Sequence, residues 1–201
     1  QLVTADEGRV GVLVTHLPHG VSATAVSVEL ELHDIPWRRA NVALFRIDGT
    51  HSNAFAANRR RMPSPPLSPI AVRQLRQAAE MAEGASLRPG LHMVGRRLRL
   101  PLLLQPFATV LVSITPFDRL PPAPPRWVEA SMAGADVVLR WTPNNEPGFY
   151  GYELLRLGPE RRVAPRLLRG ALWVDTAPPV TGSVRYAVRA ISTSGRASPI
   201  V

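Results

Sequence analysis

A two-residue alternation of apolar and polar side chains is the feature that most restricts the fold of this chain. The segment 25–34, AVSVELELHD, places an aliphatic residue at every second position, with a serine, glutamate or histidine between. Such alternation is typical of a strand with one buried and one solvated face, as antiparallel sheets have. Residues 9–16, 41–48, 97–104 and 109–115 alternate in a related way. The first half of the chain is therefore predicted to form antiparallel β-structure.

The second half of the chain also contains segments with the pattern of β-strands, and these segments are shorter. Predicted strands cover residues 137–141, 150–157, 171–176 and 184–191. Proline, asparagine and glycine separate them, which supplies a turn signal roughly every 8–12 residues. Short strands at this spacing predict a β-sandwich. Hydrophobic residues make up 45% of the chain, which is enough to fill a core.

Prolines mark the expected boundaries. Pro101 lies inside a predicted strand, and because proline cannot donate a backbone hydrogen bond, we expect an edge strand or a bulge there.

A Pro-rich run over 116–125 behaves as a short, stiff, extended segment. We therefore expect one domain over residues 1–118 and another over 126–201, joined by a linker at 119–125.

One segment has helical spacing. Ser68 is a suitable N-cap, Pro69 suits the first helical position, and Gly84 is a stop signal. The apolar residues between them repeat at helical intervals and are Val72, Leu75, Ala79 and Ala82. The predicted fold class is mainly β: two tandem antiparallel β-sandwich domains, the first with one inserted α-helix at about residues 69–83.

The composition excludes several classes of function. The chain has no cysteine, which excludes disulfide scaffolds, thiolate metal sites and cysteine nucleophiles. No apolar run reaches the roughly 18–20 residues of a membrane helix, so no membrane partner is expected. The first residue is Gln1 rather than methionine, which hints at a fragment or a processed piece. The sequence does not decide between a bacterial cytoplasmic location and secretion.

The formal net charge is +9, and all 24 basic residues are arginine. An arginine-only chain rich in alanine, glycine and proline fits a GC-rich coding bias. The alternative is a surface that meets an acidic polysaccharide. Nucleic acid is not an expected partner, because neither a helix-turn-helix nor an aromatic RNA-binding strand accompanies the charge.

No catalytic residue or cofactor is expected within the chain. The carboxylates of Glu29 and Glu31 lie on the polar face of one predicted strand, where they face water. His16 and His19 lack a convergent third ligand, so no metal site is predicted. No glycine-rich phosphate loop is present.

Tryptophan residues are candidate contacts for sugars. Trp37 follows a proline in a turn, and Trp127 follows the predicted linker. An exposed tryptophan ring can stack on a sugar, or it can wedge between domains. Trp37 and Trp127 are therefore candidate sugar or interdomain contacts, whereas Trp141 is predicted to be buried and Trp173 to pack at a sheet edge.

Residues 126–201 resemble a fibronectin type III domain. The resemblance rests on VLRWTP at 138–143, GYEL at 151–154, Asp175-Thr176, YAVRA at 186–190 and the Gly195 turn. It implies that Trp141 is the core tryptophan. It also implies that Tyr186 is the corner tyrosine, whose hydroxyl binds nearby backbone.

Residues 9–118 resemble the β-sandwich that follows the catalytic barrel in glycoside hydrolase family 39. The matching elements are FRID at 45–48, THSNAF at 50–55, PSP at 63–65, the helix 69–83 and the apolar strands through Ile114. The family includes β-xylosidases and α-L-iduronidases. The fibronectin-like part adds to the resemblance, because α-L-iduronidases carry such a domain in the same place.

The resemblance implies an accessory role. In this family two glutamates of a (β/α)₈ barrel perform retaining hydrolysis, and this chain has no βα repeat. We therefore expect a non-catalytic region of a bacterial glycosidase that braces its barrel. The loop residues that could face the barrel or the substrate rim are Asp48, Thr50, His51, Ser52 and Asn53.

Two alternatives remain open. The same loop can be an ordinary turn whose polar side chains satisfy their own backbone. The whole chain can be a stand-alone pair of carbohydrate- or protein-binding modules. The positive charge would suit a uronic-acid-containing or sulfated polymer in either case.

Overall fold

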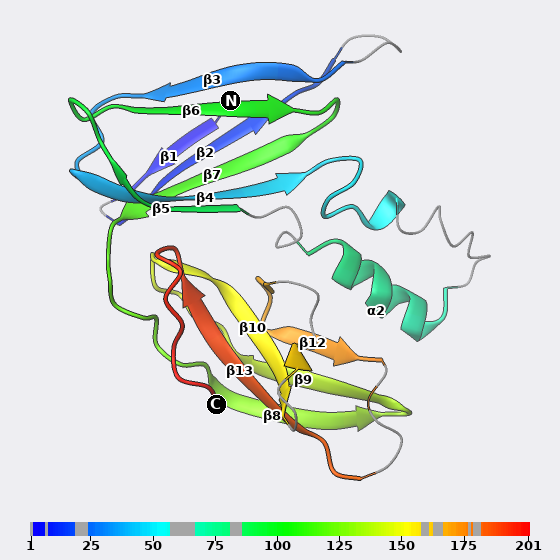
Figure 1. Cartoon of the computed structure of the whole chain (residues 1–201). Helices are drawn as coiled ribbons and strands as arrows, with labels where there is room; N and C mark the ends of the chain where they lie inside the picture. Colours follow the sequence, from blue (N-terminus) through cyan, green and yellow to red (C-terminus); the bar gives the residue numbers. More distant parts are fainter. Residues whose placement is uncertain are drawn as a thin grey trace.

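The fold consists of two β-sandwiches, one formed by the first half of the chain and one by the second (Figure 1). It is a computed structural model. The residues that it describes are 2–6, 8–18, 24–56, 67–80, 86–157, 161–162, 167–176, 178 and 182–201. The predicted fold class, mainly β with antiparallel sheets, is confirmed.

A five-stranded and a two-stranded sheet form the first sandwich. In spatial order, the strands of the larger sheet are β1 (Leu2–Ala5), β2 (Val10–Thr15), β7 (Thr109–Pro116), β4 (Arg39–Ile47) and β5 (Ser86–His92). The smaller sheet pairs β3 (Val26–Leu32) with β6 (Leu98–Leu104). The core lies between the sheets and includes Val12, Val42, Leu100, Leu102 and Val112.

The alternation predicted for the first half is clearest in the smaller sheet. Every second residue of β6 is buried, beginning with Leu98, and the residues between them are exposed. Pro101 is one of the exposed residues and pairs with Glu29 of β3. Because β3 is the only described neighbour of β6, the prediction that Pro101 lies in an edge strand is confirmed.

Two three-stranded sheets form the second sandwich. One contains β12 (Leu172–Asp175), β9 (Asp136–Thr142) and β8 (Arg126–Ala133), and the other contains β11 (Arg161–Arg162), β10 (Phe149–Leu157) and β13 (Arg185–Ser192). Trp141 is buried in its core, as predicted, and Trp173, predicted to pack at a sheet edge, lies in the outer strand β12 with its side chain buried in the same core. The last residues run beside β13, where Val188 and Val201 exchange two backbone hydrogen bonds of 2.9 and 3.0 Å.

The role predicted for Tyr186 is wrong. Its hydroxyl donates to the Asp175 carboxylate at 2.7 Å rather than to backbone, and Arg156 contacts the same carboxylate oxygen. Burial and the bond to Asp175 raise the pKa of Tyr186 to about 12. The tyrosine that contacts backbone is Tyr152, whose hydroxyl oxygen accepts from the Asn144 amide at 2.6 Å.

The inserted helix is shorter than predicted. Helix α2 spans Pro69–Ala78, and the Ser68 hydroxyl accepts from the Ala71 amide at 3.2 Å, as an N-cap does. The helix ends at Ala78 rather than at residue 83, because the next amide, at Ala79, also bonds to the carbonyl three residues back and tightens the chain into a turn. Gly84 lies outside the described residues.

The two sandwiches share a small apolar core. Residues 40–45 of β4 are buried on both faces of the sheet, although the sequence predicted one buried face. The second face is covered by the second sandwich, where the Phe45 and Tyr150 rings lie 5.7 Å apart. Hydrogen bonds also join the two sandwiches. The side chains of Asn41 and Thr115 both bond to the Thr193 hydroxyl, at 3.3 and 2.9 Å. The segment that joins the sandwiches, residues 117–125, contains neither helix nor strand, and the domain boundary within it stays a prediction.

Candidate functional site: the loop after β4 and the end of the first sandwich

The loop that follows β4 is organised by one carboxylate. Asp48 is 3% exposed, and its Oδ1 accepts from the Thr50 amide (2.8 Å), the His51 amide (2.9 Å) and the Thr50 hydroxyl (2.9 Å). The Nδ1 of His51 lies 3.0 Å from the same oxygen. This is an Asx-type turn in which the side chain replaces a backbone partner.

The electrostatics of Asp48 follow from these bonds. Burial raises the pKa of the carboxyl, but the hydrogen bonds from Thr50 and His51 outweigh burial, so the pKa is lowered from its ordinary value. Asp48 is therefore ionised at neutral pH and already accepts several hydrogen bonds. Such a carboxylate holds a loop together, and it is not suited to donate a proton as a general acid.

The other two loop residues point to different partners. The Asn53 side chain donates to the Asp48 carbonyl at 2.8 Å and accepts from the Ala56 amide at 2.9 Å, which caps a short helical turn. Ser52 has a left-handed backbone (φ 51°), and its hydroxyl donates to the Glu80 carbonyl at 2.8 Å. Because the serine hydroxyl bonds to that carbonyl and not to His51, the loop does not form an Asp-His-Ser nucleophile site.

The bond from Ser52 starts a chain of contacts that reaches the second sandwich. Glu80 follows helix α2, and its carboxylate accepts from the Arg169 amide at 3.3 Å. One helical turn earlier, the Gln77 side chain donates to the Val174 carbonyl of β12 at 2.8 Å. The loop, the helix and the second sandwich are thus linked by hydrogen bonds.

Arg169 occupies the centre of this link. Its guanidinium lies 4.9 Å from the Phe45 ring and 5.1 Å from the Phe149 ring, and it donates to the Phe149 and Tyr150 carbonyls at 3.1 and 2.6 Å. Burial lowers the pKa of Arg169. Sequence reasoning missed Glu80 and Arg169, because neither belongs to a motif and their partners are distant in sequence.

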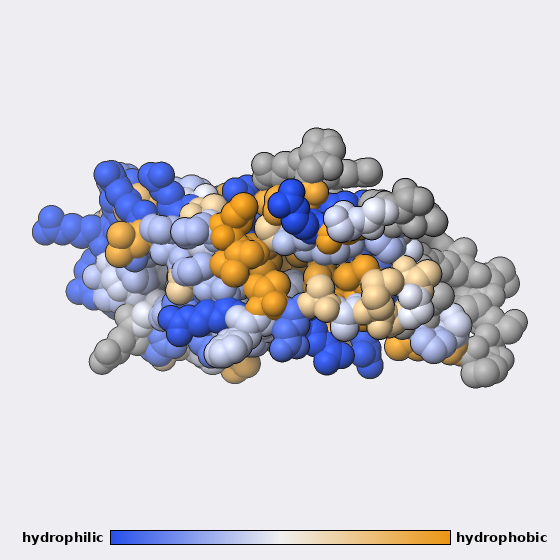
Figure 2. Space-filling view, turned by 90° about the horizontal axis from the view of Figure 1, so that it is seen from below, coloured by the Kyte–Doolittle hydropathy of each residue, from blue (hydrophilic) through white to orange (hydrophobic). Residues whose placement is uncertain are grey.

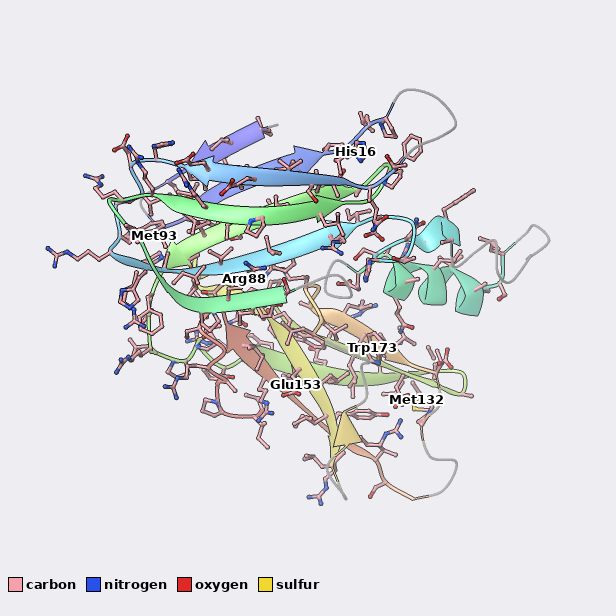
Figure 3. All side chains as sticks on the ribbon, turned by 45° about the horizontal axis from the view of Figure 1, so that its top comes forward. His16, Arg88, Met93, Met132, Glu153 and Trp173 are labelled. Carbon is pink, nitrogen blue, oxygen red and sulfur yellow. The ribbon has the colours of Figure 1, made fainter. Side chains whose placement is uncertain are left out.

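The end of the first sandwich that carries this loop exposes large apolar residues. Leu17 follows β2, Ile47 ends β4 and Phe107 precedes β7, and these three strands are neighbours. The exposed fractions are 69% for Leu17, 40% for Ile47 and 64% for Phe107, and Phe55 in the loop is 69% exposed. Figure 3 places His16, beside Leu17, at the opposite end of the sandwich from Met93.

Phe107 adopts a costly backbone conformation. The Ala108 amide bonds to the Gln105 carbonyl at 3.1 Å, which closes a turn with Pro106 and Phe107 at its centre. Phe107 has φ 58°, a left-handed conformation that costs a residue with a Cβ roughly 1–2 kcal/mol. Its strain and exposure together make Phe107 a candidate contact residue. The proline before it is the only sequence signal, and it indicates a turn rather than a contact.

The two tryptophans do not behave alike. Trp37 is half-buried and packs against the core of the first sandwich, so it does not present a free ring. Trp127 is 81% exposed, at a bulge where β8 pairs irregularly with β9. The Trp127 ring therefore does not lie between the two described sandwiches, and its assignment as a sugar or interdomain contact stays a prediction.

The second sandwich also exposes apolar groups. Figure 2 views the molecule from below and shows apolar residues gathered near the middle of that face. Exposed apolar residues of this sandwich include Met132, Ile200 and Val201.

The described residues contain no group of three or more His, Asp or Glu side chains arranged to hold a metal ion. Within the same residues, no helix is long and apolar enough to span a membrane.

Comparison with known proteins indicates a fold but does not assign a family. The sequence matches no protein-family model and no curated protein. Among solved structures, the chain is similar to a bacterial orthologue of human α-L-iduronidase, with TM-score 0.73 and 22% identity over 96% of this chain. That match shows that both sandwiches and their arrangement occur together in a known protein.

Two further solved structures match part of the chain. A family 39 glycoside hydrolase from Xanthomonas axonopodis pv. citri matches 57% of it, with 18% identity and TM-score 0.48. A β-xylosidase from Caulobacter crescentus matches 58%, with 15% identity and TM-score 0.44. The chain spans about a third or less of these proteins: 35% of the iduronidase orthologue, 25% of the Xanthomonas enzyme and 26% of the xylosidase.

Proposed function

We propose that this chain is a non-catalytic accessory region of a retaining glycoside hydrolase of the family 39 type. In this proposal it supports a (β/α)₈ barrel that carries both catalytic glutamates, and the chain supplies no acid, base or nucleophile of its own. The similarity to the iduronidase orthologue supports it, since that match covers 96% of this chain but only 35% of the enzyme.

The observation that carries the proposal is the apolar end of the first sandwich. Phe107 and Leu17 are each more than 60% exposed and lie at the ends of neighbouring strands. A soluble monomer rarely presents such a group unless it contacts another folded surface. The strained turn at Phe107 supports a contact function, because glycine would relieve the strain but would not provide a ring.

In this proposal the loop around Asp48 supports the contact. Its hydrogen bonds hold Thr50 and His51 in a compact turn beside the apolar end. His51 is partly exposed, so its ring is the loop's polar group that best suits the rim of a neighbouring active site. We assign it a positioning role in that rim and no catalytic step.

The first test is the denaturing mass of the polypeptide to which these residues belong. An antibody raised against the 201-residue chain should detect, in the cells that make it, a band of more than twice 22.0 kDa. The purified band should then hydrolyse an aryl xyloside or an aryl iduronide with retention at the anomeric carbon. A band at 22.0 kDa with no co-purifying chain would contradict the proposal and favour a stand-alone pair of binding modules.

A further inference from the structure

Strand β6 has a free edge. Its only described neighbour is β3, so half of its backbone amide and carbonyl groups point away from any described strand. Pro101 removes one possible donor from β6, but the carbonyls and the other amides remain. An edge of this kind is a template for another extended chain.

A groove lies at the start of this edge, beside the turn that joins β5 to β6. It has a volume of about 630 Å³ and runs between β5 of the larger sheet and β6 of the smaller one. Its floor is aliphatic, with Leu91, Leu98 and Leu100, and its rim carries Arg88 and Arg97 as well as Arg99 and His92. No aspartate or glutamate is among the described residues that line it. Figure 3 shows Arg88 on β5 and Met93 in the turn that leads to β6.

The chain already contains a strand that fits this chemistry. On the other edge of β6, β3 presents aliphatic residues to the core and glutamates to the outer face. Glu31 lies opposite Arg99, and their side chains form an ion pair at 3.2 Å. Arg97 and Arg88 form no ion pair with a described carboxylate. The free edge of β6 therefore has leucines and arginines beside it, as the paired edge does. It lacks the glutamate-bearing strand that β3 supplies on the paired edge.

We propose that the groove between β5 and β6 binds an extended peptide segment that alternates aliphatic and acidic residues. The segment adds to β6 as a further strand of the smaller sheet. Its aliphatic side chains pack on Leu91, Leu98 and Leu100, and its carboxylates face Arg88 and Arg97. Backbone hydrogen bonds supply affinity, and the alternation supplies specificity. This proposal does not depend on the glycosidase assignment.

A peptide fits the groove better than other polyanions do. The described lining contains no phenylalanine, tyrosine or tryptophan ring on which a sugar or a nucleobase could stack, and His92 is its only ring. The leucine floor instead matches aliphatic side chains, and a strand edge offers hydrogen-bonding groups at the spacing of another strand. A sulfated or uronic-acid polysaccharide would use the arginines alone.

The test uses a fluorescent peptide with the sequence AVSVELELHD, which is that of residues 25–34, added to the intact 201-residue chain. Fluorescence polarisation measures binding, and backbone amide NMR shifts locate it. We expect shifts in Arg88–His92 and Leu98–Leu104. The same peptide with both glutamates replaced by lysine should bind at least tenfold more weakly, because each carboxylate that faces an arginine is replaced by a like charge. A peptide with N-methyl groups on alternate amides should not bind, since it cannot pair with a strand.

Variants of the chain complete the test. The double variant R88E/R97E should weaken peptide binding about tenfold, whereas R126E, an exposed arginine on β8, should leave it unchanged. No peptide binding at millimolar concentration would overturn the proposal. So would shifts confined to β2 and β7, or heparin binding that is lost in R88E/R97E while the peptide fails to bind. The last result would identify a polysaccharide site.

Discussion

The two sheets of the first sandwich share one core but differ in what covers them. The larger sheet is buried on both faces along β4, because the second sandwich packs against its outer face through Phe45 and Tyr150. The smaller sheet has a buried inner face and an exposed outer face, and β6 has an open edge. The larger sheet is thus used for internal assembly, and the smaller one is available for contacts with other molecules.

This difference follows from the outward-facing side chains of the two sheets. The alternation pattern alone does not show which outer face is covered. Residues 40–45 of β4, ANVALF, have an apolar residue on both faces, as a strand covered on both sides needs. In β6, arginine and proline occupy two of the outward positions, Arg99 and Pro101. Both discourage uncontrolled strand pairing, so the open edge accepts a partner selectively.

The largest expected effect is on the covered face. Phe45→Ala should destabilise the chain by about 3–5 kcal/mol, because Phe45 is 4% exposed and its loss leaves a cavity against Tyr150 and Arg169. The matched control is Leu103→Ala on the outer face of β6, where Leu103 is 53% exposed, and it should change stability by no more than about 0.5 kcal/mol. Urea unfolding measures both, and equal effects would contradict the comparison.

Removal of the buried cation should have the next largest effect. Arg169→Ala leaves the Phe149 and Tyr150 carbonyls without their guanidinium donor and opens space beside Phe45. We expect a loss of about 2–3 kcal/mol in the free energy of unfolding. Arg99→Ala, which removes an exposed ion pair with Glu31, should cost no more than about 1 kcal/mol. A smaller loss for Arg169→Ala than for Arg99→Ala would show that the link between sandwiches is weak.

Asp48, in the loop after β4, should make the free energy of unfolding depend on pH. Asp48→Asn should cost about 1–2 kcal/mol at pH 7, since the charged acceptor of several bonds is lost. The pKa of Asp48 is below its ordinary 3.8 in the folded chain, so its contribution is present above 3.8 and is lost as pH falls through the folded pKa. Thermal melts of both proteins from pH 7 to pH 2 should converge at the acidic end. A constant difference would mean that another group causes the effect.

The smallest effect is expected at the turn between β6 and β7, which joins the open sheet to the covered one. Phe107→Gly should stabilise the isolated chain by about 0.5–1 kcal/mol, because glycine adopts positive φ without the Cβ penalty. Phe107→Ala removes the same ring but keeps the Cβ, and it should not stabilise. In the longer enzyme that we propose, both variants should weaken the contact with the barrel, as a lower melting temperature than that of the parent would show.

Local patterns were enough to predict most strands and the start of the helix. The alternation in 25–34 predicted β3 and its buried face, and Pro101 indicated an edge. The end of the helix was mispredicted, because the turn at Ala79 depends on local hydrogen bonds that the apolar repeat does not reveal.

The contacts that tie the site together were not predictable in the same way. Ser52 with Glu80 and Glu80 with Arg169 join residues 28 and 89 positions apart. The Asx-type turn at Asp48 was predicted as one of two alternatives, since its partners are only two and three residues away. The resemblance of 9–118 placed the loop in a family context, but not the exposed ring of Phe107 beside it.

The two-sided burial of β4 has a consequence for how the chain folds. The first sandwich, cut from the second after the linker, would expose Ala43 and Phe45 to water in the middle of a sheet. Such a fragment would tend to aggregate, and the second sandwich alone would expose Tyr150 in the same way. We therefore expect the two halves to melt in one cooperative transition, although a proline-rich segment separates them in the sequence.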